Sequence, residues 1–113
     1  MNITDSVTVG HQVAFGWEWI DANGNPPPAG TVLPVPDSTP TWADAPSAAG
    51  VDTFTSSADG STALLVASAP GSDTVTFTAV FQGTTFTASD LVTISAAVVP
   101  FVPAGVQITS AVT

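Results

Sequence analysis

Apolar residues alternate with small or polar ones in two stretches of this chain, and this alternation constrains its fold more than any other feature. In the first stretch the apolar face holds Val13, Phe15, Trp17 and Trp19, opposite Ala14, Gly16, Glu18 and Ile20. In the second, from Thr74 to Phe81, it holds Val75, Phe77, Ala79 and Phe81, with threonines on the other face. Successive side chains of a β-strand point to opposite sides, so both stretches predict strands. A convincing 3.6-residue period is absent from the sequence.

Turn signals divide the rest of the chain into short segments rich in Val, Thr, Ile and Phe, which favour strands. The turns are expected at 21–26, 58–60, 70–73 and 82–83. They separate expected strands at 3–9, 13–20, 51–55, 61–68, 74–81 and 84–96, with a short one opening at 40–42 and carrying Trp42. The prolines of 26–36 restrict Val32, Leu33 and Val35 to an edge segment or a loop. This spacing predicts an all-β, antiparallel β-sandwich of about seven strands.

Three stretches of residues 10–96 carry a resemblance to a known family. They read DANGNP, PTWADAPSAAGVDTF and ADGSTALLVASAPGSDTVTFTAVFQGTTFTASDLVTI. This series resembles a bacterial immunoglobulin-like domain of the group 2 type, although the missing lysines and an apolar tail depart from that pattern. The resemblance implies an immunoglobulin-like sandwich, and with the expected strands it covers residues 1–96. The residues 97–113 that follow are apolar and Pro-interrupted, and we expect them to form an arm or an extra edge strand. The resemblance also implies the setting of such domains, which is bacterial surface adhesins and tailed-phage virion proteins.

The charge balance excludes whole classes of partner. The 113 residues contain no Lys or Arg and nine acidic residues, which gives a formal charge of −9. Nucleic acids and anionic membranes need basic side chains to neutralise their phosphates, so we expect neither as a partner. Cysteine is absent, no apolar run reaches about 20 residues, and Met1 to Asp5 lacks the basic and apolar regions of a signal peptide. The expected route is synthesis in the host cytoplasm without a signal peptide.

Candidate sites for chemistry are few. His11 is the single histidine, no Gly-x-Ser-x-Gly elbow is present, and a polar residue at a strand start explains His11 better than a catalytic role. Calcium is the one cation for which the sequence offers plausible ligands, at Asp21, Asn23 and Asn25, but these residue types also commonly form turns. The acids at 37, 44, 52, 59, 73 and 90 fall singly at expected turns and strand ends, and most are interpreted as solvated. We therefore expect no enzyme activity and no cofactor.

Two apolar features bear on binding. Trp17, Trp19 and Trp42 suit a carbohydrate platform, but burial with Val13 and Phe15 is the preferred interpretation. The second feature is the apolar tail, whose candidate partner-binding residues are Val98, Val99, Phe101, Val102, Val106 and Ile108. The tail either pairs with an edge of its own sandwich or docks on a neighbouring subunit by strand addition, and both alternatives stay open.

The function that these observations favour is structural. We expect a protein of the outer virion surface that decorates or cements a tailed-phage capsid and contacts capsid subunits or further copies of itself. The alternative is an adhesion module that binds carbohydrate or a host surface. The virion assignment rests on the family resemblance.

Overall fold

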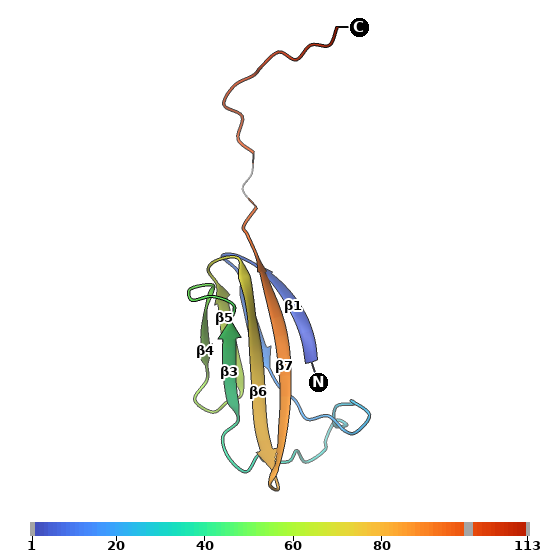
Figure 1. Ribbon diagram of the computed structural model, residues 1–113. Helices are drawn as coiled ribbons and strands as arrows, with labels where there is room; N and C mark the ends of the chain where they lie inside the picture. Colours follow the sequence, from blue (N-terminus) through green and yellow to red (C-terminus); the bar gives the residue numbers. More distant parts are fainter. Residues whose placement is uncertain (1, 99–100, 113) are drawn as a thin grey trace.

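The computed structural model describes residues 2–98 and 101–112 of the chain and shows a sandwich of two β-sheets (Figure 1). Its seven strands are β1 (Asn2–Thr8), β2 (Gln12–Gly16), β3 (Thr41–Pro46), β4 (Asp52–Ser56), β5 (Thr62–Ala67), β6 (Gly71–Phe81) and β7 (Thr84–Ser95). One sheet has the order β1-β7-β6-β3 and the other β2-β5-β4. The described residues form no helix, and hence none that could cross a membrane. The predicted all-β sandwich is confirmed.

One strand pair departs from the antiparallel pattern expected from the sequence. β1 runs parallel to β7, with Asn2 opposite Ser89 and Thr8 opposite Ser95. The chain then crosses between the sheets at residues 9–11. There the Val9 N–H donates to the Ser95 carbonyl at 2.9 Å, and the Gly10 N–H donates to the Ala67 carbonyl at 3.0 Å. The parallel pairing lets β1 complete one sheet and β2 begin the other without a long connection.

The core lies between the two sheets. Its central cluster consists of Val51, Leu65, Ala67, Val75, Val92 and Ile94. Of the inward residues predicted for β6, Val75, Phe77 and Ala79 are buried, whereas Phe81 is half-buried. Phe86 on β7 is 47% exposed. The reason is length, because β6 and β7 have 11 and 12 residues and their hairpin extends past the shorter strands of the facing sheet.

Two predicted boundaries are wrong. The strand expected over 13–20 ends at Gly16, because its partner β5 begins at Thr62, directly opposite Gly16. Trp17 and Trp19 keep the alternating burial beyond the last strand pair. The turn expected over 70–73 is wrong for residues 71–73, which begin β6: they pair with β7 from Gly71 onward and with β3 from Asp73 onward.

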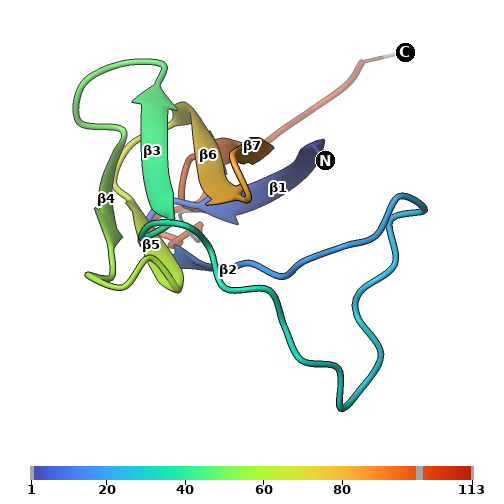
Figure 2. The same cartoon turned by 90° about the horizontal axis from the view of Figure 1, so that it is seen from below.

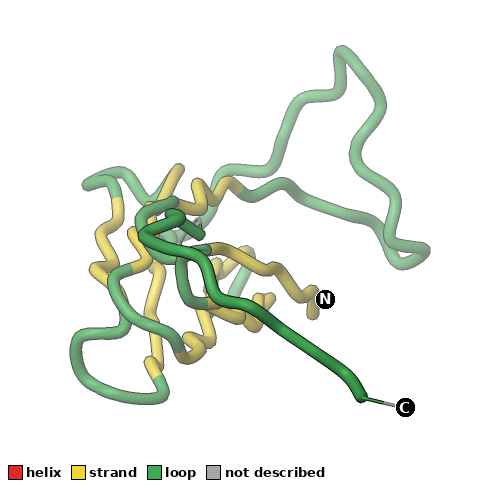
Figure 3. Tube along the Cα trace, turned by 90° about the horizontal axis from the view of Figure 1, so that it is seen from above, coloured by secondary structure: helices red, strands yellow, loops and turns green. Residues whose placement is uncertain are grey.

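The connection between β2 and β3 is a long loop that projects away from the sandwich (Figures 2 and 3). Its apolar residues Val32, Leu33 and Val35 are exposed, so the loop alternative of the sequence is the correct one. Asp37, near the end of this loop, contacts the β6–β7 hairpin. Its carboxylate accepts hydrogen bonds from the backbone N–H groups of Gln82 and Gly83.

The C-terminal segment, residues 97–113, follows β7. Its described residues form no strand and extend away from the sandwich, which gives the molecule dimensions of 77 × 30 × 22 Å (Figure 1). The described part of the segment therefore does not pair with an edge of its own sandwich. Val99, one of the predicted partner-binding residues, lies outside the described residues.

Candidate functional site

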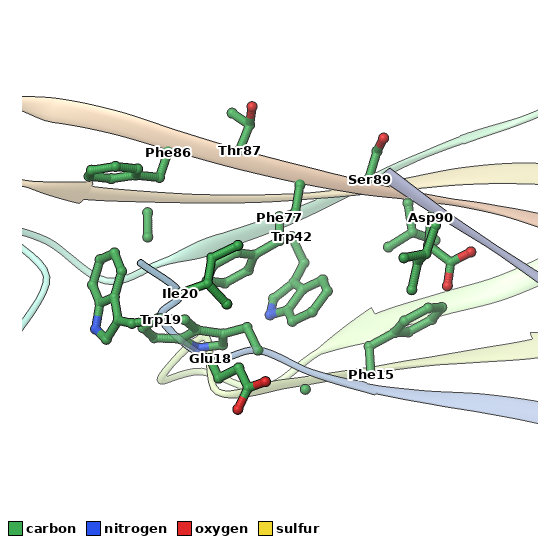
Figure 4. Close-up of a pocket in the computed structure, with 16 residues that line it drawn as sticks. Phe15, Glu18, Trp19, Ile20, Trp42, Phe77, Phe86, Thr87, Ser89 and Asp90 are labelled. Atoms are coloured by element: carbon green, nitrogen blue, oxygen red, sulfur yellow. The ribbon is translucent and has the colours of Figure 1, made fainter. Parts of the chain in front are cut away.

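An apolar groove of about 600 Å³ opens between the two sheets at the mouth of the sandwich (Figure 4). The continuation of β2 forms one wall, and β6 and β7 form the other. Trp19 and Phe86 lie toward one end of the groove, and Phe15 and Asp90 toward the other. The groove exists because β2 stops pairing at Gly16 while β6 and β7 continue, so the sheets no longer close on each other.

The aromatic rings in the groove pack mainly on one another. Trp17 stacks on Phe77 at a centroid distance of 4.8 Å, and Trp19 meets Trp17 edge to face at 5.1 Å. Trp42 contacts Phe77 at 4.7 Å, and its indole N–H donates to the Gly60 carbonyl at 3.0 Å. All three indoles are half-buried. They are neither fully enclosed core residues nor open platforms, and together they form a wall of the groove.

Asp90 is the one buried carboxyl group in the groove lining. It is 5% exposed, and neither of its oxygens has a hydrogen-bond partner. Burial, and next the nearby Asp5 carboxylate on β1, together raise the pKa of Asp90 to about 7. The sequence interpretation of Asp90 as a solvated residue is therefore wrong.

A second group of carboxylates lies close to Asp90 in the strand register, because Asp90 is opposite Val75 on β6 and Asp73 is two residues before Val75. Asp44 of β3, Asp52 of β4 and Asp73 of β6 each offer a carboxylate oxygen, and these oxygens lie within 4.8 Å of one another. Asp73 is fully buried; one oxygen accepts the Ala45 N–H at 2.9 Å, and the other has no partner. One oxygen of Asp52 is also buried without a partner. We call these three residues the acidic triad.

Two of the triad carboxyl groups, those of Asp73 and Asp44, have raised pKa values. The pKa of Asp73 is raised to about 6, chiefly by burial and next by Asp52. The pKa of Asp44 is raised by burial and by the neighbouring Asp73. The interpretation of the acids as single solvated residues is wrong for this group, because three strands from both sheets bring their side chains together.

The turn predicted at 21–26 is present, and Asp21 organises it. One oxygen of the Asp21 carboxylate accepts the backbone N–H groups of Asn23 at 2.8 Å and Asn25 at 3.0 Å. This is the hydrogen-bond pattern by which Asp stabilises a turn on its own. The carboxylate that calcium would need from Asp21, in the calcium alternative for Asp21, Asn23 and Asn25, thus already has a role in stabilising the turn.

His11 begins the second sheet. Its backbone N–H donates to the Thr8 carbonyl, and its own carbonyl accepts the Ala67 N–H, both at 3.0 Å. The side chain is exposed. This placement agrees with the structural interpretation of His11 at the start of a strand.

The described partner-binding candidates of the C-terminal segment are all exposed. They are Val98, Phe101, Val102, Val106 and Ile108, with exposed fractions from 76% for Val102 to 103% for Val106. The structure places them along one extended stretch beyond Ser95 and apart from both the groove and the acidic triad.

The comparisons with known proteins are limited to structural likeness. No family model and no curated protein matches the chain. Among solved structures it is similar to domains 1–6 of the surface layer protein SbsC, at 20% identity and a TM-score of 0.47, over 81% of this chain and 12% of that one. Domains 4 and 5 of SbsC give 19% identity and a TM-score of 0.46, over 84% and 42% of the two chains.

A third similar structure is the endo-fucoidan hydrolase MfFcnA4 of glycoside hydrolase family 107. It gives 15% identity and a TM-score of 0.42, over 87% of this chain and 13% of that one. The chain spans less than half the length of each of these three solved chains. The resemblance to group 2 bacterial immunoglobulin-like domains stays a prediction.

Proposed function

We propose that this chain is a non-enzymatic structural module that attaches to a protein assembly through its C-terminal segment. The observation that carries the proposal is the exposure of five apolar side chains on an extended segment beyond the last strand. Phe101 is 88% exposed and Ile108 is 95% exposed. Binding to a partner would remove these apolar side chains from water, which is energetically favourable.

Strand addition is the mode of attachment that suits this segment. An extended chain can supply backbone hydrogen bonds to an open sheet edge, while its alternate side chains fill apolar pockets on the partner. Pro103 interrupts such pairing at one position, so the bound segment is expected to pair in two short stretches.

The specific setting that we propose is the outer surface of a tailed-phage virion, where the chain decorates or cements the capsid. Its partners would be capsid subunits or further copies of this chain. Support for this setting comes from the family resemblance and from a surface with no basic side chain, which would not bind packaged DNA.

The test measures co-sedimentation of the purified chain with phage heads assembled without it. The variant Phe101→Ser/Val106→Ser/Ile108→Ser changes three exposed residues and should leave the sandwich folded. We expect the wild-type chain to sediment with the heads and the variant to stay in the supernatant.

The matched control is Val32→Ser/Val35→Ser, which removes exposed apolar side chains from the β2–β3 loop. This control should sediment like the wild type. Equal sedimentation of the C-terminal variant and the wild type would rule out attachment through the segment.

The apolar groove favours a second candidate function, the binding of a carbohydrate. Aromatic side chains line a volume of about 600 Å³, and Trp19 lies toward one end of it. Against this function, Trp17 has one face covered by Phe77, whereas a sugar needs an open indole face. A glycan array probed with the wild type and with Trp19→Ala tests this candidate, and a wild-type array without any signal would count against it.

A further inference from the structure

We propose that the acidic triad of Asp44, Asp52 and Asp73 binds a divalent cation, with calcium as the best fit. This site differs from the Asp21 turn, and the inference is independent of how the C-terminal segment attaches. It follows from the arrangement of the three carboxylates and from two buried oxygens, one of Asp52 and one of Asp73, that have no hydrogen-bond partner.

The separation of the oxygens agrees with a shared ion. Calcium binds carboxylate oxygens at about 2.4 Å, so two oxygens on one ion can be at most about 4.8 Å apart. The three triad oxygens all lie within 4.8 Å of one another. Three carboxylates supply part of the six to eight oxygen ligands that calcium takes, and water can supply the rest.

The buried oxygens of the triad require a positive charge or a proton. The unpartnered oxygen of Asp73 belongs to a side chain with 0% exposure, and the unpartnered oxygen of Asp52 is buried beside it. A buried carboxylate is costly unless it is paired with a cation or neutralised. The chain has no Lys or Arg that could pair with these groups, so the cation must come from solution.

The backbone around the triad is closely packed. Gly71 begins β6 against the β3–β4 connection, and a Cβ atom at this position would lie 2.8 Å from the Ser47 hydroxyl oxygen and 2.9 Å from a Val51 methyl carbon. The Ser47 N–H donates to the Ser72 carbonyl at 2.7 Å, and the Ser72 N–H donates to the Ser47 hydroxyl at 3.0 Å. These contacts position Asp52 and Asp73 before any ion binds.

A bound ion would join the two sheets. Asp44 and Asp73 belong to the β1-β7-β6-β3 sheet, and Asp52 belongs to the β2-β5-β4 sheet. The triad lies at the end of the sandwich where β3 ends and β4 and β6 begin, which is also the end from which the C-terminal segment leaves (Figure 1). The ion would therefore rigidify the part of the domain that carries this segment.

The experiment titrates the metal-free full chain with calcium chloride at constant ionic strength. Isothermal calorimetry measures the binding, and thermal unfolding measures the Tm at each calcium concentration. We expect one saturable site with a Kd on the order of 10⁻⁴ M and a rise in Tm with calcium. Asp44→Asn changes an exposed side chain and Asp73→Asn a buried one, and each should weaken calcium binding at least tenfold. A folded Asp44→Asn protein keeps the test valid if Asp73→Asn fails to fold.

Asp21→Asn is the matched control, because it makes the same change in the turn and should leave calcium affinity and the Tm shift unaltered. Terbium, which prefers the same ligands as calcium, gives a second measurement. Trp42 lies two residues before Asp44 on β3, so its excitation should sensitise terbium emission in the wild type but not in Asp44→Asn. Loss of calcium binding in Asp21→Asn alone, or no wild-type binding at about 10 mM calcium, would overturn the proposal.

Discussion

Asp73 and Asp90 lie in phase with the core residues of their strands. Asp73 precedes Val75 by two positions on β6, and Asp90 precedes Val92 by two positions on β7. The two-residue period of a strand therefore directs both carboxyl groups inward. The prediction that these aspartates fall singly at turns and strand ends, as solvated residues, does not take this period into account.

Asp90 gives a testable dependence of stability on pH. The folded protein keeps a proton on Asp90 up to a pKa of about 7, whereas the unfolded chain releases it near its ordinary pKa of about 4. Between these pH values the folded state binds more protons, so the free energy of unfolding should fall as pH rises. The contribution of Asp90 is fully present below about pH 4 and is lost as pH rises through about 7.

The variant Asp90→Asn keeps a neutral side chain at every pH. We expect it to be more stable than the wild type at pH 8 by roughly 1–3 kcal/mol and to lose much of the decline between pH 5 and 8. Urea unfolding in the presence of a chelator measures this difference and removes any effect of a bound cation. An identical pH dependence in the variant and the wild type would show that Asp90 is not protonated in the folded state.

At the scale of the strands, local pattern could predict which segments pair but not where each pairing stops. Thr74 to Phe81 alternates on its own and was recognised as a strand, whereas the preceding Pro70 to Asp73 has the composition of a turn. Residues 71–73 become strand because all three pair with β7, and β3 pairs with Asp73 from the other side. Such tertiary pairing cannot be found in the local sequence.

The candidate sites were harder to predict for the same reason. The acidic triad draws one residue from each of three strands, and Asp52 and Asp73 are 21 positions apart in the sequence. Only the arrangement of the strands brings them together. The exposed C-terminal residues, by contrast, could be named beforehand, because seven strands had already been accounted for before Ala97.

The β6–β7 hairpin depends on Asp37 from the β2–β3 loop. Its carboxylate accepts the Gln82 N–H at 3.0 Å and the Gly83 N–H at 2.9 Å, and both residues have positive φ angles of 50° and 77°. Asp37→Ala should lower the free energy of unfolding by about 1–2 kcal/mol, because two hydrogen bonds to a charged acceptor are lost. Urea unfolding checks this value, and Ser38→Ala, next to Asp37 in the loop, should leave stability nearly unchanged.

At the scale of the whole molecule, the acidic surface and the apolar C-terminal segment imply an attachment that does not depend on salt bridges. The formal charge is −9 and no basic side chain is present, so any positive charge in the interface must come from the partner. We expect the affinity for phage heads to change little between about 50 mM and about 500 mM sodium chloride, where screening of surface charges increases strongly. A steep loss of binding over this range would indicate an interface made by basic groups of the partner.

Hydrogen exchange of the full chain, free and bound to its assembly, tests the proposed attachment most directly. The described residues of the C-terminal segment lie outside every strand, so their amides should exchange in the free chain about as fast as those of an unstructured peptide. In the bound chain, amides within 101–112 should become protected, while those of β2, β4 and β5 stay as they were. Protection of the segment in the free chain, or fast exchange of the segment in the bound chain, would contradict attachment by strand addition to a partner.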